Sequence, residues 1–146
     1  MANADNTAEK EEGVKVVWKG DREACVGEDG LHLDLGEDNI LYITSAGEID
    51  GKEASVIREV ILKFINIVEG GINLLIDLNK AGKQTPETRN IWKEFSEAEE
   101  RIRKIALFGL HPVARILASF VIGVTKKKDM RFFKTKEEAL AWLEEK

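Results

Sequence analysis

The sequence has few of the residues on which disulfides and metal sites depend. Cys25 is its only cysteine, and His32 and His111 are its only histidines. A single cysteine excludes an internal disulfide and a cysteine-rich metal site, and no two of these residues have the spacing of a metal-ligand motif. The glycine motifs that bind phosphate in nucleotide-binding loops are also absent. We therefore expect neither a metal ion nor an organic cofactor.

Basic charge and long hydrophobic runs are scarce as well. The chain has 22 basic and 27 acidic residues, a net charge of -5, which argues against a general nucleic-acid binder. The longest apolar stretch, Val113–Val124, is interrupted by Arg115 and is shorter than the roughly 20 residues that span a bilayer. Residues 1–13 lack the basic start and apolar stretch of a secretory signal. We expect a cytoplasmic protein without a transmembrane segment.

The composition and length predict one globular domain with an N-terminal tail. Apolar residues make up 43% and charged residues 34% of a chain of 146 residues, which is typical of a single soluble domain. Residues 1–13 carry four acidic residues and one lysine, and this composition predicts a disordered acidic tail. The folded domain is then expected to cover residues 14–146.

Hydrophobic periodicity divides this domain into alternating strands and helices. Short apolar or alternating runs predict strands, at residues 14–18, 31–35, 39–45, 72–78, 102–110 and 130–133. Apolar residues three or four positions apart predict helices between them and at the end of the chain, and residues 79–84 are predicted to be a polar loop. This order favours an antiparallel meander followed by a largely parallel sheet with helices packed on it.

Capping residues mark three of the helix starts. Asp50 and Glu53 have the spacing of a capping box, and so do Thr135 and Glu138. Thr85 is a favourable N-cap, and the proline that follows it suits the first position of a helix. We therefore expect helices to begin directly after Asp50, Thr85 and Thr135.

Three segments resemble parts of STAS domains, which are named for sulfate transporters and anti-sigma-factor antagonists. Ile40–Asp50 resembles the strand and Gly-x-Leu-Asp entry to their first helix, and Leu74–Leu78 resembles their next strand. Arg131–Leu143 resembles the C-terminal segment of an uncharacterised subfamily similar to anti-sigma-factor antagonists. The resemblance implies an α/β fold with a mixed sheet of four to five strands, antiparallel N-terminal strands and helices packed on the sheet. It also implies a regulatory or protein-binding module rather than an enzyme.

The resemblance further directs attention to the start of the second helix. In phospho-regulated STAS domains an Asp-Ser-Ser-Gly turn opens this helix and carries the phosphorylated serine. The corresponding region here, Gly82–Thr88, lacks that motif, and Thr85 holds the comparable position. The candidates for partner binding or phosphorylation are therefore Thr85, Thr88 and Arg89. The role of N-cap is by itself enough to explain a threonine at position 85.

Two further groups of residues are candidates for binding. The predicted helix over Val113–Val124 is apolar on more than one face, which suits a homodimer interface, a partner protein or a small apolar or lipid ligand. Its candidate residues are His111, Arg115, Ser119 and Ile122. A basic patch of Lys126, Lys127, Lys128 and Arg131 suits an acidic partner or anionic headgroups, although a solvated loop paired with nearby glutamates is the favoured explanation.

These observations lead to two functional hypotheses. The first is a cytoplasmic, non-enzymatic protein-interaction or regulatory module, of the anti-sigma-factor-antagonist type. The alternative is a carrier of a small apolar or lipid ligand, which would use the helix over residues 113–124. An enzyme with His111 as acid or base beside Asp77 is the least favoured reading, because no nucleophilic or acid–base motif accompanies these two residues.

Overall fold

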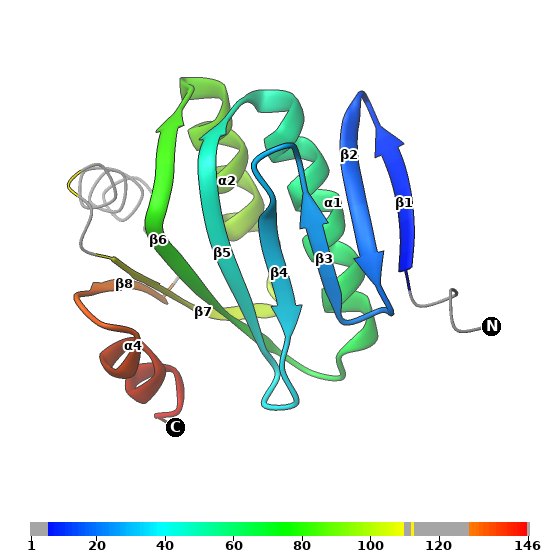
Figure 1. The fold of residues 1–146 in the computed structure, drawn as a ribbon. Coiled ribbons are helices and arrows are strands. Elements are labelled where there is room, and N and C mark those ends of the chain that lie inside the picture. Colours follow the sequence, from blue (N-terminus) through cyan, green and yellow to red (C-terminus); the bar gives the residue numbers. More distant parts are fainter. Residues whose placement is uncertain (1–5, 110–111, 113–128, 146) are drawn as a thin grey trace.

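The computed structural model describes residues 6–109, 112 and 129–145 and shows one mixed sheet with helices on both faces (Figure 1). Eight strands lie side by side in the order in which they occur in the sequence. The strands are β1 (Asn6–Glu11), β2 (Val14–Lys19), β3 (Glu23–Val26), β4 (Leu31–Leu35), β5 (Ile40–Ile49), β6 (Ile72–Gln84), β7 (Ile102–Phe108) and β8 (Asp129–Phe133). The described helices are α1 (Gly51–Ile67), α2 (Pro86–Ala98) and α4 (Lys136–Leu143).

Strand direction divides the sheet into two halves. Neighbouring strands from β1 to β5 are antiparallel, and those from β5 to β8 are parallel. The α/β class and the antiparallel N-terminal strands are thus confirmed. The expected count of four to five strands is too low, because the sheet contains eight.

β1 is the first strand that the sequence prediction missed. Residues 6–11, expected to belong to a disordered tail, pair with β2 along their whole length. The connection between the strands places Glu12 at φ 51° and Gly13 at φ 83°. Two successive positive φ angles are typical of the tight turns that join hairpin strands. A glutamate at the first of these positions is unusual in a hairpin turn, so the turn is not recognisable in the sequence. The acidic composition then suggested a disordered tail.

β3 was missed for a different reason, which is its length. Its four residues alternate between half-buried and buried positions, with Ala24 and Val26 in the core. Such a short run gives only two apolar positions on one face. Its place in the sheet depends on pairing with both β2 and β4, which no local pattern reports.

β6 extends further than the sequence predicts. Residues 79–84, expected to be a loop, continue the strand and pair with the last residues of β5, with Gln84 opposite Ile49. Gly82 allows this pairing, since a Cβ at this position would lie 2.7 Å from the carbonyl carbon of Gly47. Glycine within a strand commonly marks such a close approach of two backbones.

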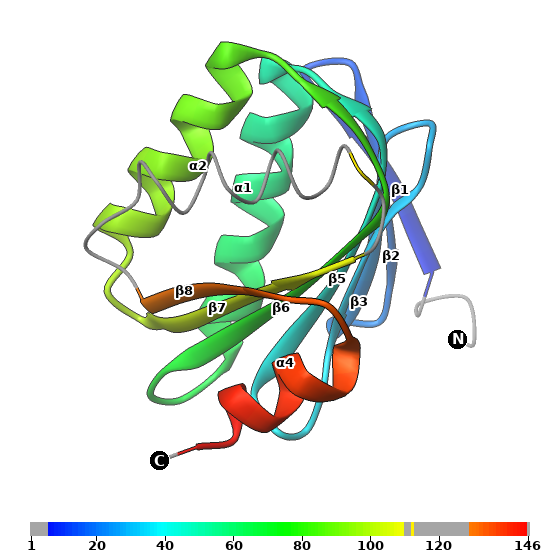
Figure 2. The same ribbon diagram turned by 90° about the vertical axis from the view of Figure 1, so that its left-hand side faces the viewer.

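The helices lie on opposite faces of the sheet, as Figure 2 shows. α1 and α2 cover one face, and α4 covers the other face over the parallel strands. Adjacent residues of β6 point to the two sides: Leu74 belongs to the larger core under α1 and α2, and Leu75 to the smaller core under α4. Both faces of the parallel strands are therefore buried, which explains their nearly continuous apolar sequences.

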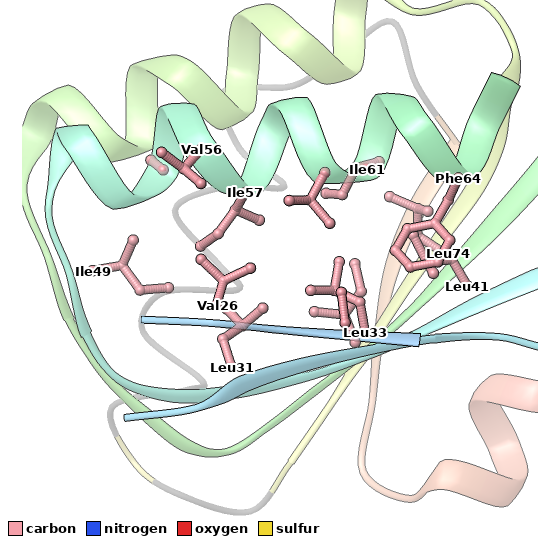
Figure 3. Packing of buried hydrophobic residues seen from close by; sticks show 14 of the residues in the cluster. Val26, Leu31, Leu33, Leu41, Ile49, Val56, Ile57, Ile61, Phe64 and Leu74 are labelled. Carbon is pink, nitrogen blue, oxygen red and sulfur yellow. The ribbon is translucent and has the colours of Figure 1, made fainter. Parts of the chain in front are cut away.

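α1 supplies the main apolar surface of the larger core. In Figure 3, Ile57, Ile61 and Phe64 project from this helix toward the sheet, in which β4 carries Leu31 and Leu33. The spacing of three and four residues places these side chains on one face. The predicted capping box is confirmed at its start, where the Asp50 carboxylate accepts the N–H of Glu53 at 2.9 Å, and the Glu53 carboxylate accepts that of Asp50 at 3.2 Å.

α4 is held against the second face by aromatic and cationic contacts. The ring of Trp142 lies 5.6 Å from that of Phe133, between centroids. Lys104 Nζ and the guanidinium carbon of Arg131 lie 5.0 and 5.1 Å from the centroid of the Trp142 ring. Lys104 also donates hydrogen bonds to the carbonyls of Trp142 and Glu145 at 2.8 and 3.0 Å, which caps the C-terminal end of the helix.

Within the described residues, no helix combines the length and the apolar character that crossing a membrane requires.

Candidate functional site

The carboxyl ends of β5 and β6 and the start of α2 meet at one end of the parallel half of the sheet (Figure 1). β6 leads into α2 through the single residue Thr85. The exposed residues here include Lys80 and Lys83 on β6, Thr85, and Glu87 in the first turn of α2. We call these four residues the α2-start surface. In open α/β sheets, binding sites commonly form where parallel strands end.

Thr85 is the N-cap of α2, as predicted. Its side-chain oxygen accepts the backbone N–H of Thr88 at 3.1 Å, and its backbone carbonyl accepts that of Arg89, also at 3.1 Å. The hydroxyl oxygens of Thr85 and Thr88 are 2.9 Å apart. Thr85 is nevertheless exposed, so its hydroxyl combines a structural role with access from solvent.

Thr88 lies in the core rather than on the surface where the sequence analysis placed it. Its side chain is fully buried, and its hydroxyl donates a hydrogen bond to the carbonyl of Ile49 at 2.9 Å. Because this proton is used at Ile49, the hydroxyl of Thr85 is the donor in its contact with Thr88. Thr88 therefore anchors α2 to the end of β5 and is not accessible to a partner or a kinase.

Arg89 fixes the connection between β6 and α2. Its Nη1 donates a hydrogen bond to the carbonyl of Gln84 at 2.7 Å, and the residue is half-buried. The charged donor makes this a strong bond. Arg89 thus fixes the backbone of Gln84, which directly precedes Thr85 of the α2-start surface.

A cavity of about 110 Å³ lies between the sheet and the two helices α1 and α2. Most of the side chains that line it are aliphatic or aromatic, and they come from β4 to β8 and from both helices. The described lining residues are Leu31, Ile43, Ser45, Ile49, Ile57, Ile61, Leu74, Ile76, Leu78, Gln84, Trp92, Phe95, Ser96, Ile102, Ile105, Leu107 and Met130. None of these residues is charged, so the part of the cavity that they form is strongly apolar.

One polar atom of this cavity has an unusual environment. The side-chain oxygen of Gln84 is buried, and none of the residues that the structure describes donates a hydrogen bond to it. Ser96, by contrast, uses its hydroxyl proton within its own helix, with the carbonyls of Trp92 and Lys93 at 2.8 and 3.1 Å. A buried oxygen without a donor lowers the stability of the folded protein by about 1–3 kcal/mol. A ligand that donates a hydrogen bond would remove this cost.

This cavity was not predicted, because the residues that line it have the same sequence pattern as ordinary core residues. Ile57 and Ile61 have the spacing of an ordinary buried helix face, and Leu74, Ile76 and Leu78 that of a buried strand. Gln84 was expected to lie in a polar loop. The signal in the sequence was a polar residue directly before a helix N-cap, and only the register of β5 and β6 shows that this residue belongs to a strand.

The other candidate residues are distributed as follows. Of the basic patch, Arg131 is described: it is exposed on β8 and contacts the Trp142 ring. Asp77 accepts hydrogen bonds from the backbone and side-chain nitrogens of Asn79 at 2.9 and 3.0 Å, which is a local structural role. The residues that lie outside the described part are His111, Arg115, Ser119, Ile122, Lys126, Lys127 and Lys128, together with the helix predicted over residues 113–124.

Cys25 and His32 lie opposite each other on β3 and β4, far in sequence from the α2-start surface. His32 Nε2 is 2.7 Å from a carboxylate oxygen of Glu23, and this hydrogen bond lowers the pKa of Glu23. Burial, and then the negative charge of Glu23, raise the pKa of the Cys25 thiol, which disfavours the reactive thiolate. No cluster of three or more metal-ligating side chains occurs in the residues seen in the structure.

The mixed sheet, the helix on its second face and the direct passage from β6 into α2 define a small α/β module of the STAS type. A family model described as SpoIIAA-like matches residues 40–144. The chain belongs to this SpoIIAA-like family, which confirms the resemblance to STAS domains similar to anti-sigma-factor antagonists. The matched range begins at β5, so it contains the four strands β5 to β8. Strands β1 to β4 precede this range, which accounts for the low strand count expected from the resemblance.

Solved structures support the same fold. An uncharacterised protein of the DUF3478 family with a SpoIIAA-like fold, from Shewanella loihica PV-4, matches with a TM-score of 0.59. The match covers 77% of this chain and 91% of that chain, at 14% sequence identity. At this identity the likeness shows the fold alone. Comparison with curated proteins finds no relative of the sequence.

Proposed function

We propose that the chain is a cytoplasmic, non-enzymatic regulatory module that binds a partner protein through the α2-start surface. The observation that carries this proposal is the way in which this surface is held. The bond from Thr88 to Ile49 ties α2 to β5, and the bond from Arg89 to Gln84 ties α2 to β6. A surface whose supporting side chains are fixed in this way loses little conformational entropy when a partner binds.

The charges of the α2-start surface give the test of this proposal. Lys80 and Lys83 are exposed on β6, and Lys15 and Lys19 are exposed on β2 toward the other edge of the sheet. The full-length chain is used to capture partners, and the affinity of a captured protein is then measured. We expect the double variant Lys80→Glu, Lys83→Glu to bind at least tenfold more weakly, because reversing two charges in an interface creates repulsion.

The double variant Lys15→Glu, Lys19→Glu is the matched control, since it changes the net charge by the same amount. It should bind the partner as the unmodified chain does. If both double variants weaken binding equally, the effect is one of overall charge and the assignment of the surface is wrong. The partner is either a different protein or a second copy of the chain, and the oligomeric state of the purified chain distinguishes the two.

Thr85 is the proposed regulated residue of this surface, and two substitutions isolate the effect of charge. Asp and Asn are both good N-caps, so Thr85→Asp and Thr85→Asn retain the cap and differ only in the negative charge. We expect Thr85→Asp to change the partner affinity at least fivefold and Thr85→Asn to leave it within twofold. Equal affinities of the two variants, measured by titration calorimetry, would remove the phosphorylation switch and leave the binding surface intact.

The cavity favours a second candidate function, the carriage of a small apolar molecule. Its apolar lining and its position between the sheet and two helices suit a molecule rather than a surface contact. The helix predicted over residues 113–124, through which the sequence hypothesis binds such a ligand, lies outside the described residues. Native mass spectrometry of the gently purified chain should show an additional mass at one molecule per chain. A bare chain from several preparations would count against carriage.

A further inference from the structure

We propose that the cavity selects a small neutral molecule with a ring-sized apolar body and one hydrogen-bond donor, which the side-chain oxygen of Gln84 accepts. This inference rests on the second proposed function and names its class of ligand. Three properties of the cavity support it: its size, the absence of charge among its described lining residues, and the unpaired oxygen at Gln84.

The size of the cavity limits the ligand to about one aromatic ring or a short alkyl chain. Its volume is about 110 Å³. A dry apolar cavity of roughly 150 Å³ in another protein binds benzene. Trp92 and Phe95 of α2 and isoleucines of α1 are among the lining residues and provide flat and aliphatic walls. A single ring is therefore at the upper limit of what the cavity can hold.

The described lining residues argue against a charged ligand. No lysine, arginine or histidine is among them, so a carboxylate or phosphate placed against these residues would be buried without a compensating charge. An anionic lipid is thus the less favourable occupant of this part of the cavity. A neutral molecule avoids this cost.

Gln84 supplies the polar group that orients such a ligand. As the last residue of β6 it pairs with Ile49 of β5, and its carbonyl is held by Arg89 at 2.7 Å. Its side-chain oxygen is buried and receives no hydrogen bond from the described residues. A hydroxyl or N–H donor on the ligand would satisfy this oxygen. The hydroxyl proton of Ser96 is already used within α2, so Ser96 does not supply this donor.

Toluene and phenol test this inference, since they have nearly the same shape and only phenol carries a donor. The full-length chain is labelled with ¹⁵N, and each compound is titrated while the three indole N–H signals are followed. Trp92 lines the cavity, whereas Trp18 and Trp142 do not, so the latter two serve as internal controls. We expect both compounds to shift the Trp92 signal saturably and to leave the other two nearly unchanged.

The variant Gln84→Met removes the acceptor while keeping the size of the side chain. We expect it to lower the affinity for phenol relative to toluene by about tenfold, the effect of one lost neutral hydrogen bond. An unchanged phenol-to-toluene ratio would overturn the role of Gln84 and leave the cavity as a carrier site. The same loss of ratio in Ser96→Ala, and not in Gln84→Met, would also overturn it. Failure of both compounds to shift Trp92 would contradict carriage itself.

Discussion

Replacing Phe64 with alanine should lower the free energy of unfolding by about 3–5 kcal/mol, the range for a large aromatic residue removed from a core. Phe64 is fully buried in α1, and the centroid of its ring lies 5.3 Å from that of Trp18 on β2. It therefore joins the helix to the antiparallel half of the sheet. Since domains of this size are stable by about 5–15 kcal/mol in total, the variant loses a large fraction of its stability.

Urea unfolding measured by circular dichroism gives this change in free energy. Ile67→Ala is the matched control, because Ile67 belongs to the same helix and its side chain is 44% exposed. We expect the control to change stability by less than about 0.5 kcal/mol, as for other surface substitutions. A loss below about 1 kcal/mol in Phe64→Ala would show that α1 does not pack on β2 as described.

Trp142→Ala should also cost about 3–5 kcal/mol, because Trp142 is the main anchor of α4. Its side chain is 5% exposed and packs on Phe133. Removing the ring also removes the aromatic surface against which Lys104 and Arg131 lie. We expect α4 to separate from the sheet and to expose Leu75 and Phe108, which it now covers.

Two measurements follow this separation. Urea unfolding gives the loss of stability, and binding of a hydrophobic dye reports the exposed second face of the sheet. Trp142→Phe keeps a ring and should lose less than half as much stability, without added dye binding. If Trp142→Ala binds no more dye than the unmodified chain and loses less than about 1 kcal/mol, then α4 is not held by this residue.

The sequence predicted the local features of the fold well. The N-caps at Asp50, Thr85 and Thr135 are confirmed by hydrogen bonds to the third residue of each helix. Capping depends on residues close together in sequence, so its pattern is complete in a short segment. The periodicity of the apolar residues likewise predicts the alternation of strands and helices over residues 40–108.

Features that depend on distant partners escaped the sequence. β1 and the end of β6 are polar segments, and each becomes a strand because a neighbouring strand lies within hydrogen-bonding distance. The cavity likewise requires side chains from seven elements to surround one space. No single segment of the sequence indicates such an arrangement. Gln84 is recognisable there only as a polar residue before a helix.

The candidate site was predicted in position but not in detail. Thr85, Thr88 and Arg89 do lie together at the start of α2. Thr85 is the N-cap and has an extended backbone outside the helix, whereas Thr88 lies in the first turn of α2 on the side that faces β5. Thr85 is consequently exposed, and Thr88 is buried against Ile49. The sequence could not show which side of this helix faces the sheet.

The central claim is that a partner protein binds at the α2-start surface, and a map of chemical shifts tests it most directly. The ¹⁵N-labelled full-length chain is recorded with and without the captured partner, and every amide signal is compared. We expect the largest shifts to fall between Lys80 and Arg89, with small shifts between Lys15 and Cys25. Large shifts over β2 and β3, with none at the start of α2, would contradict it.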